Sequence, residues 1–428
     1  MTTAKHTLVV LNPGHFHAAL TLRKTHPRLA DDVYVYSEDG PDLDRFLRIV
    51  QTFNERAIDA THWKLHIYRG TDYLDRLRAE RPGEVVIIAG RNDTKMASIH
   101  RLHADGFFVL GDKPWTIGTE QLAMLRDTVA TPPLVMDIMT ERSEIANRVQ
   151  KALIARPEVF GSFRSDGDEP AIYMRSVHHL YKVVNQQPLV RPAWYFDIAV
   201  QGEGVTDVPT HLADLAQWMT GGDRPFDYER DVELLSARQW STDVPLETFT
   251  RITGLREFPE SLRSRVAGGV LRYLCNAEIS YRLRGIPVRL ESVWELAIPQ
   301  GGGDTHHAIA RGSKADLIVD QGPATHFKTE LVVRPIAGAS DYPRILKTAI
   351  ASLQGEFPGL GVEPTEAAVR IVIPPALRTT LEEHFAAVLE AFLDCVDQGS
   401  STENSGADLI AKYTLLARAA EMSRRSDE

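Results

Sequence analysis

The chain has 428 residues, 43% hydrophobic and 25% charged, which is an ordinary composition for a globular protein with a sizeable core. The formal net charge of −10 at pH 7 argues against a nucleic-acid binder, because such proteins neutralise phosphates with excess basic residues. Cys275 and Cys395 lie outside any zinc-binding spacing, so we expect neither a disulfide framework nor a structural zinc site. Without an apolar run of membrane-spanning length or a signal-peptide pattern, the expected compartment is the cytoplasm, with no membrane partner.

The first third of the chain alternates between strand-like and helix-like patterns. Short apolar or β-branched runs predict strands, and apolar residues at helical spacing predict helices between them. The expected strands cover 7–12, 31–37, 84–90, 107–114 and 133–140, and the expected helices cover 15–25, 42–57, 93–106 and 120–130. Alternation of this regularity predicts a parallel, doubly wound Rossmann sheet that binds ligands at the carboxyl ends of its strands.

The pattern changes after residue 140. A helix at 144–155 precedes a long aromatic-rich and proline-rich stretch, and alternating runs then predict a large, mainly antiparallel sheet. These runs cover 231–240, 277–285, 287–298 and 315–321, and two helices at 379–398 and 407–425 close the chain around the polar loop 399–406. We therefore expect an α/β protein with a dinucleotide-binding domain at 1–138 and an α+β substrate domain at 139–428.

The segment from Gln201 to Trp218 places Asp207, His211 and Asp214 at spacings of four and three. Residues at these spacings share one face of a helix, and Pro209 suits a first helical turn. An apolar stripe beside this face would pack against the core; it consists of Leu212, Leu215, Ala216 and Met219. One interpretation is a carboxylate and an imidazole that face a cleft, and the other is an aspartate-capped helix with a solvated histidine.

A candidate nucleotide site follows the first strand, at the turn Asn12–Pro13–Gly14. A helix that begins near His15 would present its N–H groups to a pyrophosphate. Only Gly14 remains of the three glycines in the usual G-x-G-x-x-G pattern. In this strand–helix–strand context we expect Asn12, Gly14, His15 and Phe16 to contact a dinucleotide, the alternative being a domain of this fold that binds nothing.

The end of the second strand bears on the choice of dinucleotide. Ser37 and Glu38 can hydrogen-bond to a ribose 2′-hydroxyl, and the acidity of Glu38 and Asp39 would repel a 2′-phosphate. The sequence therefore favours NAD over NADP.

Several motifs resemble those of the glucose–fructose oxidoreductase/inositol dehydrogenase (Gfo/Idh/MocA) family. Residues 84–114 resemble the family segment that ends in Glu-Lys-Pro, and residues 204–218 resemble its D-x-G-x-H-x-x-D helix. Three segments resemble sequences of a subgroup that is named only for its oxidoreductase C-terminal domain: "SVHHLYK", "PLVRPAWYFD" and "GDTHHAI". The resemblance spans essentially the whole chain.

This resemblance implies an NAD-dependent enzyme that forms homodimers or homotetramers. It gives Lys113 the place of the catalytic lysine, Asp207 that of the aspartate and His211 that of the histidine. It also places Asn92 beside the nicotinamide-side ribose. The chain departs from the family pattern at Asn12 and His17 (for glycines), Ser37 (for aspartate), Lys95 (for histidine), Asp112 (for glutamate) and Pro209 (for glycine).

The chemistry of these residue types agrees with the implied roles. Oxidation of a secondary alcohol needs a base for the hydroxyl proton, and an imidazole with an ordinary pKa of about 6.5 can act at neutral pH. Asp207 would orient the His211 imidazole or hold the substrate. The Lys113 ammonium can stabilise negative charge on the reacting oxygen.

The stretch before the catalytic helix combines basic and aromatic side chains, which suit the hydroxyls and C–H faces of a sugar. We expect His179, Lys182 and Tyr195 to reach substrate, whereas about half of the set can be packing or surface residues. Lys182 with Arg191 can also bind a carboxylate or sulfonate. The adjacent pairs His178–His179 and His306–His307 lack a supporting carboxylate spacing, so no metal is expected. The candidate substrate residues are His179, Lys182, Arg191, Trp194, Tyr195 and Asp214.

The sequence thus predicts an NAD-dependent dehydrogenase for a secondary hydroxyl of a sugar, polyol or glycoside. The leading alternative is an NAD-dependent glycosidase, which oxidises its substrate transiently, eliminates the aglycone, adds water and reduces the ketone again. An anionic sugar glycoside would suit that alternative. A third possibility is a protein of this fold that senses NAD and sugar without catalysis.

Overall fold

The computed structural model describes residues 5–184, 187–222, 224–299, 301–336, 341–399 and 406–426. Most of the predicted polar loop at 399–406 therefore lies outside the described residues. The chain divides into two compact units. The first comprises Met1–Thr140, Ala199–Gly202 and Thr380–Ala417, and the second comprises Glu141–Ile198, Glu203–Thr379 and Arg418–Glu428.

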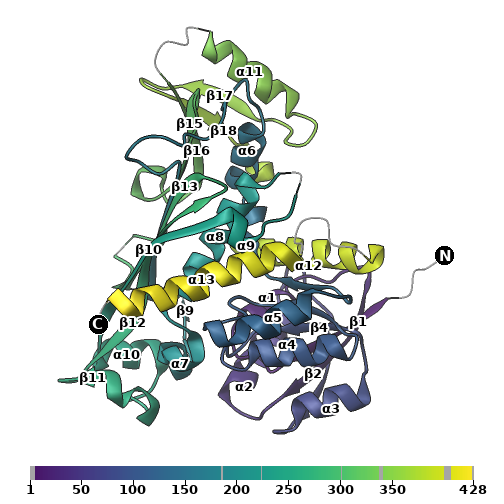
Figure 1. The fold of residues 1–428 in the computed structure, drawn as a ribbon. Helices are drawn as coiled ribbons and strands as arrows, with labels where there is room; N and C mark the ends of the chain where they lie inside the picture. Colours follow the sequence, from purple (N-terminus) through teal and green to yellow (C-terminus); the bar gives the residue numbers. More distant parts are fainter. Residues whose placement is uncertain are drawn as a thin grey trace. The chain divides into compact units, whose positions relative to one another are not determined.

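The first unit contains a six-stranded sheet whose strand pairs are all parallel, in the order β3-β2-β1-β4-β5-β6. This is the order of a Rossmann fold, which confirms the predicted doubly wound sheet. Its strands are β1 (His6–Leu11), β2 (Leu29–Ser37), β3 (Lys64–Arg69), β4 (Val85–Ile88), β5 (Phe108–Gly111) and β6 (Val135–Asp137). Its helices are α1 (His17–Leu20), α2 (Pro41–Glu55), α3 (Tyr73–Glu80), α4 (Lys95–Ala104), α5 (Leu122–Val129) and α12 (Leu381–Gln398). Figure 1 shows α2 to α5 beside these strands.

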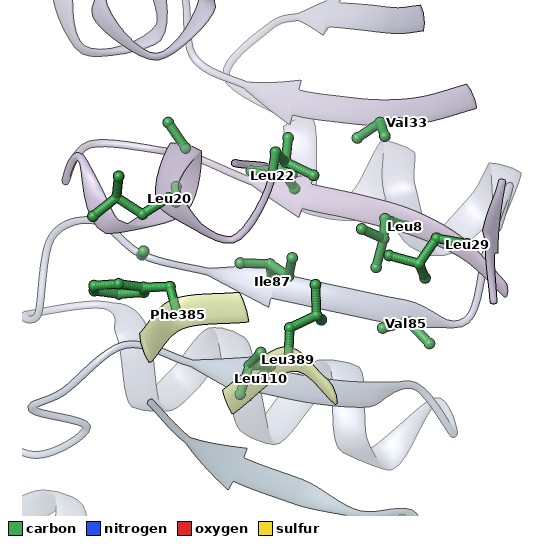
Figure 2. Packing of buried hydrophobic residues seen from close by; sticks show 14 of the residues in the cluster. Leu8, Leu20, Leu22, Leu29, Val33, Val85, Ile87, Leu110, Phe385 and Leu389 are labelled. Carbon is green, nitrogen blue, oxygen red and sulfur yellow. The ribbon is translucent and has the colours of Figure 1, made fainter. Parts of the chain in front are cut away.

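The central strands are apolar because both of their faces are covered. Every residue of β4 is buried, as expected for a strand inside a parallel sheet with helices on both sides. Alternate residues of β1 point to opposite faces, and Leu8 and Val10 join one large core cluster. Figure 2 shows Leu8 in this cluster with Val33, Ile87 and Leu110 of the neighbouring strands.

The same cluster explains a difference from the predicted domain boundary. The first division between the compact units lies near Thr140, and residues 380–417 lie in the first unit, whereas the sequence analysis placed all of 139–428 in one domain. Helix α12 turns an apolar face that includes Phe385, Leu389 and Phe392 into the core of the first sheet (Figure 2). Because a sequence period shows only that a helix has an apolar face, it did not predict which sheet would cover that face.

Helix α13 (Gly406–Ser426) carries a buried ion pair within the first unit. Lys412 Nζ lies 2.8 Å from Asp137 Oδ2, both side chains are almost fully buried, and the Tyr413 hydroxyl donates to the same oxygen. We expect Lys412→Met to destabilise the protein by about 3–5 kcal/mol, because it leaves a buried carboxylate without its cation. Denaturant unfolding measures this loss. Lys412→Met/Asp137→Asn should recover part of it, and an equally unstable double variant would contradict the electrostatic explanation.

The helix predicted at residues 15–25 is much shorter in the structure. Helix α1 covers only His17–Leu20, and tighter turns follow, in which Leu22 N–H donates to Ala19 and Arg23 N–H donates to Leu20. The Thr21 hydroxyl donates a hydrogen bond to the Ala18 carbonyl at 2.7 Å. In a continuous α-helix this carbonyl would accept from the Leu22 N–H. A side chain that competes in this way disfavours continuation of the helix.

The second unit contains a ten-stranded sheet in which every pair is antiparallel except β13 with β7. This confirms the predicted large, mainly antiparallel sheet. Its strands are β7 (Ile172–Tyr181), β10 (Val232–Pro245), β11 (Val266–Ala267), β12 (Val270–Leu283), β13 (Ile286–Ala297), β14 (Thr305–Arg311), β15 (Ala315–Gln321), β16 (Glu330–Pro335), β17 (Gly361–Pro364) and β18 (Val369–Val372). The short strands β8 (Val183–Val184) and β9 (Gln187–Pro188) pair with each other in antiparallel fashion.

Several helices accompany this sheet, and Figure 1 shows α6 and α8 beside its strands and α11 beside the short strand β17. The helices of this part of the chain are α6 (Ile145–Ile154), α7 (Ile198–Gln201), α8 (Val208–Thr220), α9 (Tyr228–Asp231), α10 (Leu246–Thr253) and α11 (Tyr342–Ser352). Within the described part of the chain, every helix is too short or too polar to cross a lipid bilayer.

Candidate functional site

The carboxyl edge of the first sheet begins at the turn after β1. Asn12 has a φ of 43°, in the left-handed region that asparagine tolerates better than most residues other than glycine. Gly90, after β4, approaches this turn so closely that an added Cβ would lie 2.5 Å from the Asn12 carbonyl oxygen. Asn12 therefore takes the conformation that the missing motif glycine would have supplied, and Gly90 makes room for it.

The predicted pyrophosphate contacts of this turn need correction in part. The backbone N–H groups of Gly14 and His15 both donate to the Ala89 carbonyl at 3.0 Å, so they hold the turn against β4. The four-residue α1 also supplies far less of a helix dipole than the predicted helix would. A contact between a dinucleotide and the half-buried Phe16 stays a prediction.

The end of β2 brings together the residues predicted for the ribose. The Ser37 hydroxyl donates to Asn12 Oδ1 at 3.1 Å, and Asn12 Nδ2 donates to the Tyr73 hydroxyl at 3.3 Å. Burial raises the pKa of Tyr73, and the negative charge of Glu38 raises it further. Glu38 itself is exposed. An exposed carboxylate beside a fixed polar pair is suited to bind ribose hydroxyls.

Asn92, which the resemblance placed beside a ribose, is tied to its own unit. Its side-chain nitrogen donates to the Gln201 carbonyl at 2.7 Å, and its side-chain oxygen accepts from Lys95. The buried Lys95 ammonium also donates to the carbonyl of Pro114, at 3.3 Å. Lys95 thus connects Asn92 to the residue that follows Lys113, a positioning role that the sequence did not reveal.

Two histidines after β1 meet an aspartate after β5. His15 Nδ1 lies 2.9 Å from Asp112 Oδ2, and His17 Nδ1 lies 3.1 Å from both oxygens of Asp112. Burial lowers the pKa of His15 to about 3, and the charges of His17 and Lys113 act in the same direction. Burial alone would raise the pKa of Asp112, but the charge of His17 and the hydrogen bonds from both imidazoles hold it well below its ordinary value.

In the second unit, helix α8 confirms the predicted amphipathic helix. It begins at Val208 with Pro209 in its first turn, and all four residues of the predicted apolar stripe are buried. Asp207 occupies the N-cap position, but its side chain makes no capping hydrogen bond. The Tyr195 hydroxyl instead donates to Asp207 Oδ2 at 3.4 Å, and His211 is half-buried one turn further along the helix. The interpretation of an aspartate cap is therefore wrong.

The predicted role of Asp214 in substrate binding is contradicted by its contacts. The side chain is buried, and its two oxygens accept a bidentate pair of hydrogen bonds from Arg142, at 2.6 and 2.8 Å. This ion pair holds α8 to the segment before α6. Asp214 is a structural residue.

A stability prediction follows for this pair. We expect Asp214→Ala to lower the free energy of unfolding by about 3–5 kcal/mol, since it removes the carboxylate from a largely buried ion pair and keeps the Arg142 guanidinium there. Chemical denaturation followed by circular dichroism measures the change. Asp341→Ala is the matched control, because the Asp341–Arg344 pair is exposed and should contribute less than about 1 kcal/mol. Equal effects in both variants would contradict this view of Asp214.

Arg191 and the aromatic residues near it serve mainly in packing. The Arg191 guanidinium is buried, donates to the Leu180 carbonyl at 3.1 Å, and stacks over the rings of Tyr195 and Trp294. The predicted contact of Arg191 with a substrate anion is therefore not supported by its surroundings. Trp194 is also buried, whereas Tyr195 keeps its link to Asp207. Burial raises the pKa of Tyr195 well above its ordinary value, so its hydroxyl remains a donor.

Near the end of β7, the basic side chains of His178, His179 and Lys182 all contact one acidic residue, which the sequence analysis missed. Asp304 accepts from Lys182 Nζ at 2.5 Å, and its oxygens lie 3.3 Å from His178 Nδ1 and 3.0 Å from His179 Nδ1. His179 is buried, so its predicted contact with substrate is not supported, while Lys182 keeps about a fifth of its side chain exposed. The only sequence signal for Asp304 was its place in the phrase "GDTHHAI".

The fold and these clusters can now be compared with known proteins. The family model described as "Putative oxidoreductase C terminal domain" matches residues 149–424. The chain belongs to this family. This is the C-terminal domain family that the sequence motifs predicted, and the match confirms that part of the recognition.

Solved structures extend the likeness over the whole chain. A crystal structure described as a putative oxidoreductase from Parabacteroides merdae ATCC 43184 is 37% identical, covers 100% of this chain and 99% of its own, and has a TM-score of 0.95. GenD2 from gentamicin A biosynthesis, in complex with NAD, is 14% identical, covers 100% and 96%, and has a TM-score of 0.61. Levoglucosan dehydrogenase, in complex with NADH and L-sorbose, is 14% identical, covers 99% and 98%, and has a TM-score of 0.61. No curated protein matches the chain.

Proposed function

We propose that this protein is an NAD-dependent oxidoreductase that transfers hydride between nicotinamide and a secondary hydroxyl of a sugar, polyol or glycoside. The observation that carries the proposal is the oxidoreductase family match over residues 149–424, joined to a six-stranded sheet of Rossmann order. Two structures of the same fold support the cofactor and the carbohydrate, because one was solved with NAD and the other with NADH and L-sorbose.

The residues at the carboxyl edge of the first sheet fit a dinucleotide at its adenosine end. Asn12, Ser37 and the exposed Glu38 supply fixed polar groups for ribose hydroxyls, and the acidic side chain disfavours a 2′-phosphate. The N–H groups of Gly14 and His15 already donate hydrogen bonds to the Ala89 carbonyl, so we expect other donors to bind the pyrophosphate. When bound, NAD supplies the ring that accepts hydride from the substrate carbon.

Three residues of the chain carry the proposed proton chemistry. Lys113, directly after Asp112 at the end of β5, would hydrogen-bond to the reacting oxygen and stabilise negative charge there. His211 would take the hydroxyl proton, since an imidazole titrates near neutral pH. Asp207 makes no capping hydrogen bond in α8, and its Oδ2 accepts from the Tyr195 hydroxyl; the role proposed for its carboxylate is to orient His211 or a substrate hydroxyl.

A single assay tests this function against the two alternatives. The purified full-length chain is incubated with NAD and a panel of sugars, polyols and glycosides, and both NADH and released aglycone are measured. Net NADH formation is the expected result. Aglycone release with catalytic NAD and no net NADH would identify an NAD-dependent glycosidase. Thermal stabilisation by NAD and a sugar without any turnover would identify a sensing protein and overturn the enzymatic proposal.

A further inference from the structure

The search for further sites leads back to the two histidines and the aspartate at the carboxyl edge of the first sheet. His15 and His17 come from the segment after β1, and Asp112 from the residue after β5. Their ligand atoms, one from each residue, all lie within 4.8 Å of one another. In the described residues this is the only group of three or more histidine, cysteine or carboxylate side chains that meets this condition.

The distances between these atoms are those of donors that share an ion. Two donors bound to one metal at about 2.0–2.2 Å lie about 3.3–3.6 Å apart in tetrahedral geometry and about 2.8–3.1 Å apart when they subtend a right angle. The Nδ1 atoms of His15 and His17 lie 2.9 and 3.1 Å from the nearest oxygens of Asp112, and the two imidazole rings are 4.0 Å apart between centroids. A small movement of one imidazole ring would allow all three ligand atoms to bind the same ion.

Burial and access also suit a metal. The Asp112 side chain is 3% exposed, whereas His15 and His17 keep 19% and 14% of their side chains exposed. The carboxylate is therefore fixed inside the unit, while the imidazoles border solvent and leave an entry path.

We propose that His15, His17 and Asp112 form a site for one divalent transition-metal ion. Two imidazoles and one carboxylate are ligands that suit Zn²⁺ or Fe²⁺, and three protein ligands leave coordination positions for water or another ligand. Asp112 directly precedes Lys113, so the ion would lie next to the lysine assigned to the reacting oxygen. The proposal stands on the cluster alone and does not rest on the dehydrogenase function.

Co²⁺ binding to the full-length chain tests the site without any substrate or NAD. The protein is stripped with a chelator and titrated with Co²⁺, whose visible absorption reports coordination by protein ligands, and bound Zn²⁺ is counted by elemental analysis. We expect one ion per chain. Asp112→Asn and His17→Ala should each weaken binding by at least about tenfold, because each removes one of three ligands. Circular dichroism and the melting temperature of the metal-free variants check that they fold.

The matched control is His66→Ala. His66 contacts Asp32 in an exposed pair of the same unit, which offers two donors rather than three, and its loss should leave binding unchanged. Absence of stoichiometric binding would mean that the cluster is only a hydrogen-bonded triad and would overturn the proposal. Binding that persists in both Asp112→Asn and His17→Ala would also overturn it. Either failure leaves the NADH assay untouched, so the two proposals fail separately.

Discussion

Lys113→Ala is expected to lower kcat by about 10²–10⁴-fold while NAD still binds. The proposed role of the ammonium is to stabilise charge on the reacting oxygen, and that charge develops only in the transition state. The side chain is removed without changing Asn12, Ser37 or Glu38, which we assign to the ribose. Steady-state kinetics on the substrate found in the panel gives kcat, and calorimetric titration gives the Kd for NAD.

Lys24→Ala is the control for this experiment. Lys24 belongs to the same unit and forms an exposed pair with Glu383, so its removal deletes a lysine without touching the edge of the sheet where ligands bind. Its kcat should match that of the unmodified protein. Normal turnover in Lys113→Ala would refute the assignment of the lysine.

The second large effect is expected for His211→Ala, which should reduce alcohol oxidation near neutral pH by about 10²–10⁴-fold. The imidazole is the proposed acceptor of the hydroxyl proton, and an alanine cannot replace it. His211→Asn, which keeps much of the size and polarity, should be equally impaired if proton transfer is what has been lost. A stopped-flow measurement of the hydride-transfer step separates this loss from slow product release.

His307→Ala provides the comparison within the second unit. His307 is a partly exposed strand residue that pairs with Asp320, and its loss should leave the rate unchanged. An ordinary rate in His211→Ala would remove that residue as the base. A raised KM with an unchanged kcat would assign His211 to substrate binding instead.

Much of the first unit could be predicted from the sequence because its central strands are apolar on both faces. β1 and β4 are short, nearly continuous apolar runs, and such runs are typical of strands inside a parallel sheet. β3 has no such run, since most of Lys64–Arg69 is exposed, and it was therefore missed. β7 was missed because histidine and arginine interrupt its apolar alternation.

The candidate site was harder to predict because its contacts join residues far apart in sequence. Helical spacing correctly placed His211 and Asp214 on one helix, with Asp207 at its N-cap, but it could not show that Arg142, 72 positions away, would hold Asp214. Asp304 meets Lys182 across 122 positions, which no local motif indicates. His15 and His17 likewise meet Asp112 across 97 and 95 positions, which no local motif indicates.

The assignment of residues 380–417 to the first unit has a consequence for the order in which the protein can be made. A nascent chain that has emerged only as far as residue 140 has every strand of the first sheet but lacks Phe385, Leu389 and Phe392, which cover part of one face. That face stays uncovered until Thr380–Ala417 is translated, which is after most of the second unit. The first unit is therefore completed only near the end of translation, although its strands are made first, and until then we expect it to expose an apolar surface of the kind that chaperones bind.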